Sequence, residues 1–345
     1  MSRTAIAAMT AYTLELREAA TKLNQNENPF DFPPELKRTL VNAIVERRWN
    51  RYPDFESNAL RGAIAKAYGL APENILVGNG SNELLAAAIG TFVGPNTPTI
   101  IPRPSFSLYE KLVTVAGGAI VNVDVDPRHA HLPLAEMIDA ASANEHAVVI
   151  VCSPNNPTGG ILPPGGVERL LDTGATLLFD RAYGDFANDS LPLLHERLVT
   201  FSTFSKAWGL AGLRIGWLAA TAGTAREVRK VKLPYSLNIV SEAAAVLALE
   251  NRAIRDKNVS VLVRERERLA AAMRGIRRIE VFPSAANFIS FRTERPAKAI
   301  FDELCARGIL IRDISGYFGL ANCLRVSVGT AEENDQFVAV LKEIA

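Results

Sequence analysis

The feature that most constrains the fold of this chain is a series of short apolar runs, each bounded by turn residues. Residues 75–77, 147–153 and 175–180 are rich in Val, Ile, Leu and Phe and show no alternation of polar and apolar side chains. Such runs are typical of strands that are buried on both faces of a mostly parallel sheet. Further runs of this kind are 99–102, 120–125, 198–202 and 214–220. The sequence therefore predicts an α/β fold.

Segments with helical periodicity accompany these runs. Residues 35–49 carry apolar side chains at a helical spacing, and the helix expected over 58–68 is followed by Gly69, a residue that often ends helices. The glycine turn of GNGSNELL (78–85) leads into another helix, for which we expect Ser81 as the N-cap. Helices are thus expected to flank the central sheet.

The pattern changes after about residue 245. A long amphipathic helix is predicted over 256–278. The other predicted elements are strands over 279–282, 287–291, 309–312 and 324–328 and helices over 298–307 and 332–343. A chain of 345 residues can form two domains. We expect a large domain over 31–245 and a smaller α+β domain formed by 246–345 together with an N-terminal arm, 1–30.

Composition argues against several binding partners and indicates the compartment of the protein. The formal net charge is +1, which gives no reason to expect nucleic-acid or membrane binding. Cys152, Cys305 and Cys323 are far apart and odd in number, so we expect free thiols and a reducing, cytoplasmic compartment. The start of the chain lacks the apolar region of a signal peptide, and no apolar run is long enough to span a bilayer. No metal-ligand spacing is present, so no metal site is expected.

One stretch, FSTFSKAWGLAGLRIGW (201–217), places a single lysine at the end of an apolar run. Thr203 and Ser205 can hydrogen-bond an anion, and Arg214 can hold a phosphate with two parallel hydrogen bonds. Desolvation lowers the charge of a buried lysine, so Lys206 can act as a nucleophile toward an aldehyde. Taken by itself, Lys206 is better explained as an ordinary lysine whose stem lies on the surface, and only the combination with the other groups favours a reactive amine.

Three more clusters follow strands or open a helix. They are CSPNNPTGG (152–160), Asp180 in LLFDRAYGDF, and the glycine turn at 78–85, whose helix start can bind an anion. Each has a plain structural explanation as a turn or a cap. Ligands of parallel α/β sheets bind beyond the carboxyl ends of the strands, so these clusters are expected to meet. An amine, an anion site and a carboxylate together suit pyridoxal 5′-phosphate. A nucleotide-binding Rossmann enzyme is an alternative that leaves Lys206 and Arg214 unexplained.

Taken in order, several segments resemble the fold type I pyridoxal-phosphate-dependent aminotransferases, and most closely the histidinol-phosphate aminotransferase family. The segments are LNQNENPF, RYPD, PNNPTG, FDRAY, TFSKAWGLAGLRIGW, GILIRDIS and NCLRVSVGT, and they span nearly the whole chain. The resemblance implies a large domain with a mostly parallel central sheet flanked by helices and a smaller α+β domain. It also implies a homodimer with shared active sites.

The activity implied by this resemblance is amino transfer between histidinol phosphate and 2-oxoglutarate, in histidine biosynthesis. Small-molecule amino acids and 2-oxo acids would be the substrates. The alternatives within the fold are an aminotransferase for aromatic or other amino acids, or a phosphothreonine decarboxylase. An alternative from another class is a ligand sensor without catalysis, but all the reactive residues of the family are present.

The resemblance assigns three catalytic residues. Lys206 would bond to the cofactor's aldehyde and carry the proton to and from the substrate Cα, and Asp180 would pair with the ring nitrogen. Tyr183 and Asn156 would hydrogen-bond the phenolic oxygen, and Phe106 would stack on the ring. The family usually has an acid after the Asp, where this chain has Arg181, and many relatives have Tyr in place of Phe106.

The remaining assignments concern the two anionic ends of the ligands. The residues expected to hold the cofactor's phosphate are Ser81, Asn82, Thr203, Ser205 and Arg214, with Tyr52 reaching it from the partner subunit. Arg325 would bind the substrate α-carboxylate, and Arg312 would help bind the substrate phosphate. Asn26, in the NENP segment, would close over the substrate.

Overall fold

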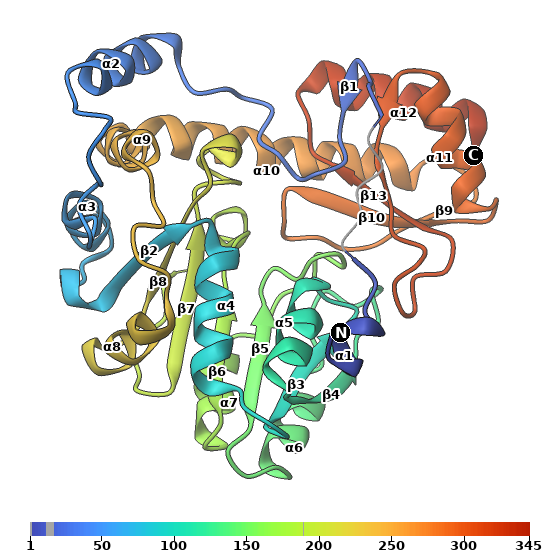
Figure 1. The fold of residues 1–345 in the computed structure, drawn as a ribbon. Helices are drawn as coiled ribbons and strands as arrows, with labels where there is room; N and C mark the ends of the chain where they lie inside the picture. The colour runs from blue at the N-terminus through green and yellow to red at the C-terminus, as the bar shows by residue number, and fades with distance from the viewer. Residues whose placement is uncertain (1, 12–16, 189) are drawn as a thin grey trace.

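The computed structural model describes residues 2–11, 17–188 and 190–345, and its largest element is a seven-stranded sheet (Figure 1). Its strands follow the order β2-β8-β7-β6-β5-β3-β4. Their bounds are β2 (Ile75–Asn79), β3 (Pro98–Arg103), β4 (Ala119–Asp124), β5 (Val148–Cys152), β6 (Thr176–Asp180), β7 (Leu198–Thr203) and β8 (Ile215–Ala219). All seven strands coincide with predicted apolar runs.

The large sheet is parallel except at one strand. β8 pairs antiparallel with both β2 and β7. The other pairs are parallel: β7 with β6, β6 with β5, β5 with β3, and β3 with β4. The expected α/β fold with a mostly parallel central sheet is therefore confirmed. The carboxyl ends of β5, β6 and β7 meet at one edge, which is where a ligand site is expected.

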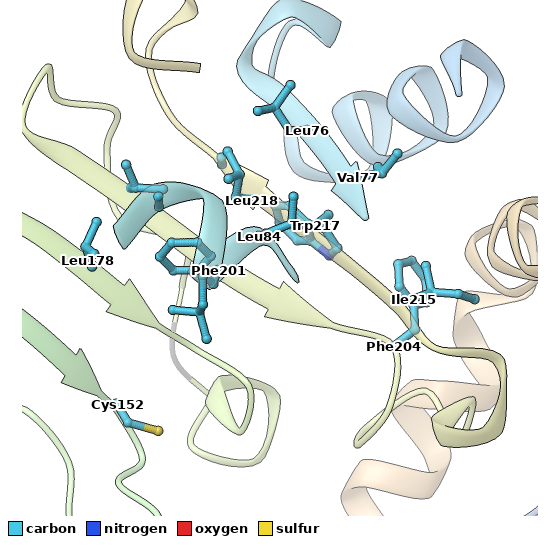
Figure 2. Packing of buried hydrophobic residues seen from close by; sticks show 14 of the residues in the cluster. Leu76, Val77, Leu84, Cys152, Leu178, Phe201, Phe204, Ile215, Trp217 and Leu218 are labelled. Atoms are coloured by element: carbon cyan, nitrogen blue, oxygen red, sulfur yellow. The ribbon is translucent and has the colours of Figure 1, made fainter. Parts of the chain in front are cut away.

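Both faces of the sheet are buried, which explains the continuous apolar runs. In β5, Val148, Ile150 and Cys152 pack on one face, while Val149 and Val151 pack on the other. The first face is covered by α3 (Asn58–Tyr68), α4 (Ser81–Phe92), α5 (Leu108–Ala116), α8 (Ala222–Val231) and α9 (Ile239–Glu250). The second is covered by α6 (Leu134–Ser142) and α7 (Gly166–Asp172). Figure 2 shows the first core, with Phe201 and Trp217 among its fully buried side chains.

A second unit follows α9 along the chain. α10 (Arg252–Arg274) leads into a four-stranded antiparallel sheet in the order β12-β13-β10-β9 (Figure 1). The strands are β9 (Ile279–Val281), β10 (Phe288–Thr293), β12 (Arg312–Asp313) and β13 (Cys323–Ser327), and the helices are α11 (Ala297–Ala306) and α12 (Ala331–Ile344). The single strand predicted over 309–312 is two strands, because β11 (Ile309–Leu310) pairs with β1 (Thr21–Lys22) and not with β13.

The N-terminal segment contacts both units. β1 joins the second unit through β11, whereas α1 (Thr4–Ala7) packs against α5 on the large sheet (Figure 1). α2 (Pro34–Val45) is shorter than the helix predicted over 35–49 and packs on α9. The domain boundaries 31–245 and 246–345 with 1–30 stay predictions. Among the described residues, no helix is both long and apolar enough to cross a membrane.

Candidate active site

A cavity lies between the carboxyl ends of β5, β6 and β7 and the small sheet. Its lining includes Cys152, Asp180 and Thr203 at the ends of these strands, and Arg312 and Arg325 from β12 and β13. The structure brings together in this cavity Asn26, Ser81, Asn82, Phe106, Asn156, Asp180, Tyr183, Thr203, Ser205, Lys206, Arg214, Arg312 and Arg325. The only predicted site residue outside it is Tyr52, and the roles of the others stay predictions.

The start of α4 forms one end of the cavity and depends on two glycines. Gly80 has a φ of +78° and precedes the helix, and a Cβ there would lie 2.7 Å from the Arg214 guanidinium. A Cβ on Gly216 would lie 2.1 Å from the Ser81 backbone nitrogen. The expectation that Ser81 is the N-cap is wrong: Gly80 takes that position because it requires a positive φ, and Ser81 is the first helical residue.

Hydroxyl groups and a guanidinium complete this end. The backbone N–H of Ser205 donates to Thr203 Oγ1 over 3.0 Å, and Arg214 Nη1 donates to Ser205 Oγ over 3.3 Å. Arg214 itself has a φ of +51°, which turns the chain into β8. Hydroxyls, a guanidinium and a helix N-terminus with free N–H groups form an arrangement that suits a phosphate.

Lys206 lines the cavity. Its Nζ donates to the backbone oxygen of Gln25 over 2.9 Å and lies 5.9 Å from the ring centroid of Tyr183. Burial, followed by the positive charge of Arg325, lowers the pKa of Lys206 to about 8. A neutral amine is therefore accessible near neutral pH, as a nucleophile or base requires.

Asp180 is buried and held by two donors. Its Oδ1 accepts from the backbone N–H of Ala182 over 2.9 Å, and its Oδ2 accepts from the hydroxyl of Tyr109 over 2.7 Å. Burial raises the pKa of Asp180, and these two hydrogen bonds oppose that rise. The carboxyl group can thus pair with a cationic or N–H group of a ligand inside the cavity.

Tyr183 is bound to the N-terminal segment. Asn26 Nδ2 donates to the Tyr183 hydroxyl over 3.0 Å, and the backbone N–H of Asn26 donates to Ser327 Oγ over 2.8 Å. Asn26 has a φ of +54°, a conformation that asparagine tolerates better than most residues. This segment therefore links the large sheet, through Tyr183, to β13, through Ser327.

Two arginines of the small sheet face the same cavity. Arg312 and Arg325 are direct partners across the antiparallel pair β12–β13. Arg325 donates to Asn156 Oδ1 and, over 3.0 Å, to the backbone oxygen of Asn24. The guanidinium of Arg325 also lies 5.2 Å from the ring centroid of Phe288. Two adjacent cations at one wall suit an anionic part of a ligand.

The structure shows where the two residues that depart from the family pattern, Arg181 and Phe106, are located. Arg181 is buried and its guanidinium packs against Gly184, while Phe106 lines the cavity as an aromatic ring. Tyr52 is 81% exposed and stacks on Tyr235, with ring centroids 4.6 Å apart. Within one chain Tyr52 therefore does not contribute to the cavity.

Sequence reasoning missed several residues of the lining. They include Asn24, Gln25, Tyr109, Ile314 and Tyr317. Asn24 and Gln25 precede the NENP segment, so their nearness to Asn26 was a usable signal. Tyr109 lies three residues after Phe106, in the turn that leads into α5, so its closeness to Phe106 in the sequence was also a usable signal. No such signal marks Tyr317.

The cavity fits pyridoxal phosphate on the observations above. The glycine-lined start of α4 with Arg214 suits a phosphate, the buried Asp180 suits a ring nitrogen, and Lys206 offers an amine of lowered pKa. Among the described residues, no group of three or more His, Cys, Asp or Glu side chains could hold a metal ion.

The fold and this cavity define the class of protein. A family model described as aminotransferase class I and II matches residues 18–341, and the chain belongs to this family. Its curated relatives include proteins named histidinol-phosphate aminotransferase. That of Aquifex aeolicus is 36% identical over 96% of this chain and 95% of its own length. That of Chlorobium phaeovibrioides is 38% identical over 97% of this chain and 94% of its own length.

A solved structure agrees with these relatives. The histidinol-phosphate aminotransferase of Sinorhizobium meliloti, in complex with pyridoxal-5′-phosphate, superposes with a TM-score of 0.87. It is 28% identical, and the match covers 99% of this chain and 96% of that one. The fold expected from the resemblance, that of fold type I aminotransferases, is therefore confirmed.

Proposed function

We propose that this protein binds pyridoxal phosphate and transfers an amino group between histidinol phosphate and 2-oxoglutarate, in histidine biosynthesis. The names of its relatives support this proposal, as does the cofactor in the Sinorhizobium meliloti structure. The observation that carries the choice of substrate is the pair Arg312 and Arg325 on the wall of the lysine cavity.

The chain's own residues would divide the work as follows. When bound, pyridoxal phosphate supplies an aldehyde that bonds to an amine and a ring that accepts an electron pair from carbon. Ser81, Asn82, Thr203, Ser205 and Arg214 hold the cofactor's phosphate, and Tyr52 is assigned to it from the partner subunit. Asp180 pairs with the ring nitrogen, Asn156 and Tyr183 with the phenolic oxygen, and Phe106 stacks on the ring.

Lys206 is the group that moves the proton. With a pKa of about 8, its Nζ is partly neutral near neutral pH and can take a proton from the substrate Cα. The hydrogen bond to the Gln25 backbone oxygen fixes Nζ within the cavity. Lys206→Ala should abolish turnover and the part of the visible absorbance that depends on a covalent bond between the cofactor's aldehyde and Nζ. Full turnover in that variant would contradict this role.

One anion site must bind different anionic groups of the two substrates. Glutamate carries an α-carboxylate, whereas histidinol phosphate carries a phosphate monoester in its place. Arg325 can bind either group in a bidentate manner, and Arg312 adds the second cation that a dianion requires. Asn26, hydrogen-bonded to Tyr183, borders the substrate side of the same cavity.

A half-reaction assay tests the substrate. The cofactor-loaded protein is mixed separately with histidinol phosphate, phenylalanine and threonine phosphate, and loss of the visible absorbance is followed. We expect histidinol phosphate to give the highest kcat/KM. Preference for phenylalanine would indicate an aromatic aminotransferase, and release of carbon dioxide from threonine phosphate would indicate a decarboxylase. Either result would overturn the substrate assignment.

We also propose that the active form is a homodimer. α2 buries Ile44 but exposes Val41 by 59% and Val45 by 65%, and Trp49 beyond its end is 70% exposed. Tyr52, three residues after Trp49 in the sequence, is 81% exposed, and the resemblance assigns it to the cofactor phosphate of the partner subunit. A second copy of the chain would cover the apolar side chains and bring Tyr52 to a cavity. A cytoplasmic location is supported by Cys152 and Cys323, whose thiols form no disulfide.

A further inference from the structure

The buried carboxyl group of Asp180 has a partner that the proposed reaction does not yet use. Tyr109 is fully buried, and its hydroxyl donates to Asp180 Oδ2 over 2.7 Å. The other oxygen, Oδ1, is held by the backbone N–H of Ala182 over 2.9 Å. One donor on each oxygen fixes the rotation of the carboxyl group at the end of β6.

Tyr109 is itself held in place by the start of α5. Its backbone N–H donates to the Phe106 backbone oxygen over 3.0 Å, and the two rings meet edge to face with centroids 5.6 Å apart. Phe106 lines the cavity where a ring is expected to stack. The turn that leads into α5 thus supplies both the stacking ring and the donor to Asp180.

The other groups that face Asp180 do not replace this donor. Cys152, on the neighbouring strand β5, donates its S–H to the Pro154 backbone oxygen over 3.1 Å, and burial raises the pKa of its thiol. Burial also raises the pKa of Tyr183, whose hydroxyl accepts from Asn26. Both groups remain neutral near pH 7, so neither brings a charge that would compensate burial of the carboxylate.

The charge of Asp180 is therefore set by a balance between two opposing effects. Burial favours the neutral acid, and the hydrogen bonds from Tyr109 and Ala182 favour the carboxylate. A hydrogen bond to a charged acceptor is stronger than one between neutral groups. Of the two donors, only Tyr109 donates from its side chain, because Ala182 donates from its backbone N–H.

We propose that Tyr109 is a positioning residue that orients the Asp180 carboxyl group and holds it ionised, so that it can keep the cofactor's ring nitrogen protonated. This inference rests on the proposed binding of pyridoxal phosphate. Tyr109 would act on the ring nitrogen through Asp180 and would not contact the substrate itself.

The test is the variant Tyr109→Phe, which removes the hydroxyl and keeps the ring against Phe106. Native and variant proteins are loaded with pyridoxal phosphate labelled with ¹⁵N in the ring, and the ¹⁵N chemical shift is measured as a function of pH. We expect the native ring nitrogen to stay protonated, and the variant to lose that proton at a lower pH. Cofactor affinity, measured by equilibrium dialysis, should fall about tenfold.

A matched control and a second variant make the result specific. Tyr68→Phe removes a hydroxyl from a partly buried tyrosine that packs on Trp217, and it should leave the ¹⁵N shift unchanged. Tyr109→Met fills the same position without a donor, so it should reproduce the effect of Tyr109→Phe and serves if that variant fails to fold.

A double-mutant cycle separates positioning from general packing. If Tyr109 acts through Asp180, then Tyr109→Phe should weaken cofactor binding in the native background and have little effect in the Asp180→Asn background. An unchanged ¹⁵N shift in both Tyr109 variants, or an equal loss of affinity in both backgrounds, would overturn this inference. Failure of the native protein to bind the cofactor would instead overturn the proposed function.

Discussion

Arg312 and Arg325 lie directly opposite each other across the antiparallel pair β12–β13, and both line the cavity that contains Lys206. Like charges in this position destabilise a strand pair. Arg325 is held in the wall of the cavity by hydrogen bonds to Asn156 and to the Asn24 backbone oxygen. The pair is therefore suited to a ligand group that carries two negative charges.

The first prediction concerns this pair. Arg312→Gln should raise KM for histidinol phosphate by about 10- to 100-fold, because a hydrogen bond to a charged group contributes about 1.5–3 kcal/mol. KM for glutamate, whose α-carboxylate carries a single charge, should change much less. Steady-state kinetics with both substrates measure this difference. Arg292→Gln, on β10 and paired with Glu280 outside the cavity, is the control and should change neither KM. Equal increases for both substrates would contradict a phosphate role.

The second prediction concerns the pH at which Lys206 reacts. The pKa of Lys206 is lowered to about 8, so Nζ is protonated and unreactive below that pH and neutral above it. The rate at which the cofactor-free protein captures pyridoxal phosphate should therefore rise with pH, with a midpoint near 8. Rapid mixing with detection of the visible absorbance measures this rate.

Variants of neighbouring charges test the cause of that shift. Arg325 is the largest contributor after burial, so Arg325→Gln should move the midpoint to a higher pH. Lys230→Gln, an exposed residue of α8 paired with Glu227, should leave it unchanged. A midpoint close to 10.5, the ordinary lysine value, would show that Lys206 is not desolvated in solution.

The large sheet could be predicted because burial on both faces leaves a strong trace in the sequence. β5 packs Val149 and Val151 on one face and Ile150 on the other, so every position of the strand is apolar. The ends of such runs also fixed where Asp180 and Lys206 would lie. The positions of the site residues relative to the sheet edge were thus predictable, whereas their hydrogen-bond partners were not.

The features that sequence reasoning missed depend on tertiary contacts. Ser81 has a suitable side chain for an N-cap, but the close approach of Gly216 and the positive φ of residue 80 place Gly80 there. In the sequence, Tyr109 has no feature that distinguishes it from a core residue of α5. Its hydrogen bond to Asp180 forms because the end of β6 lies beside α5 in the fold. The structure of one chain does not test the role of Tyr52, because the proposed role requires a second copy of the chain.

The third prediction concerns the close approach of two elements at the phosphate end. A Cβ at residue 216 would lie 2.1 Å from the Ser81 backbone nitrogen, so Gly216→Ala must push β8 away from the start of α4. Overpacking of this kind costs about 1–3 kcal/mol of unfolding free energy. Cofactor affinity should fall as well, because the helix start moves.

Denaturant unfolding and equilibrium dialysis measure the two effects. Gly212→Ala is the matched control, since a Cβ at residue 212 meets nothing within 4 Å. It should preserve both stability and affinity. If Gly216→Ala behaved like this control, the cradle formed by β8 and α4 would be looser than the structure indicates.

The fourth prediction concerns assembly. Val41, Val45 and Trp49 follow each other at intervals of four residues and are each more than half exposed, so a second copy of the chain should cover them. Val41→Lys combined with Val45→Lys should convert a dimer to a monomer in sedimentation velocity, because it buries like charges at the contact. Val115→Lys, 44% exposed on α5, is the control and should leave the dimer intact.

The monomeric variant should also lose most of its activity, because Tyr52 then reaches no cavity. A dimeric, fully active double variant would place the subunit contact elsewhere on the molecule.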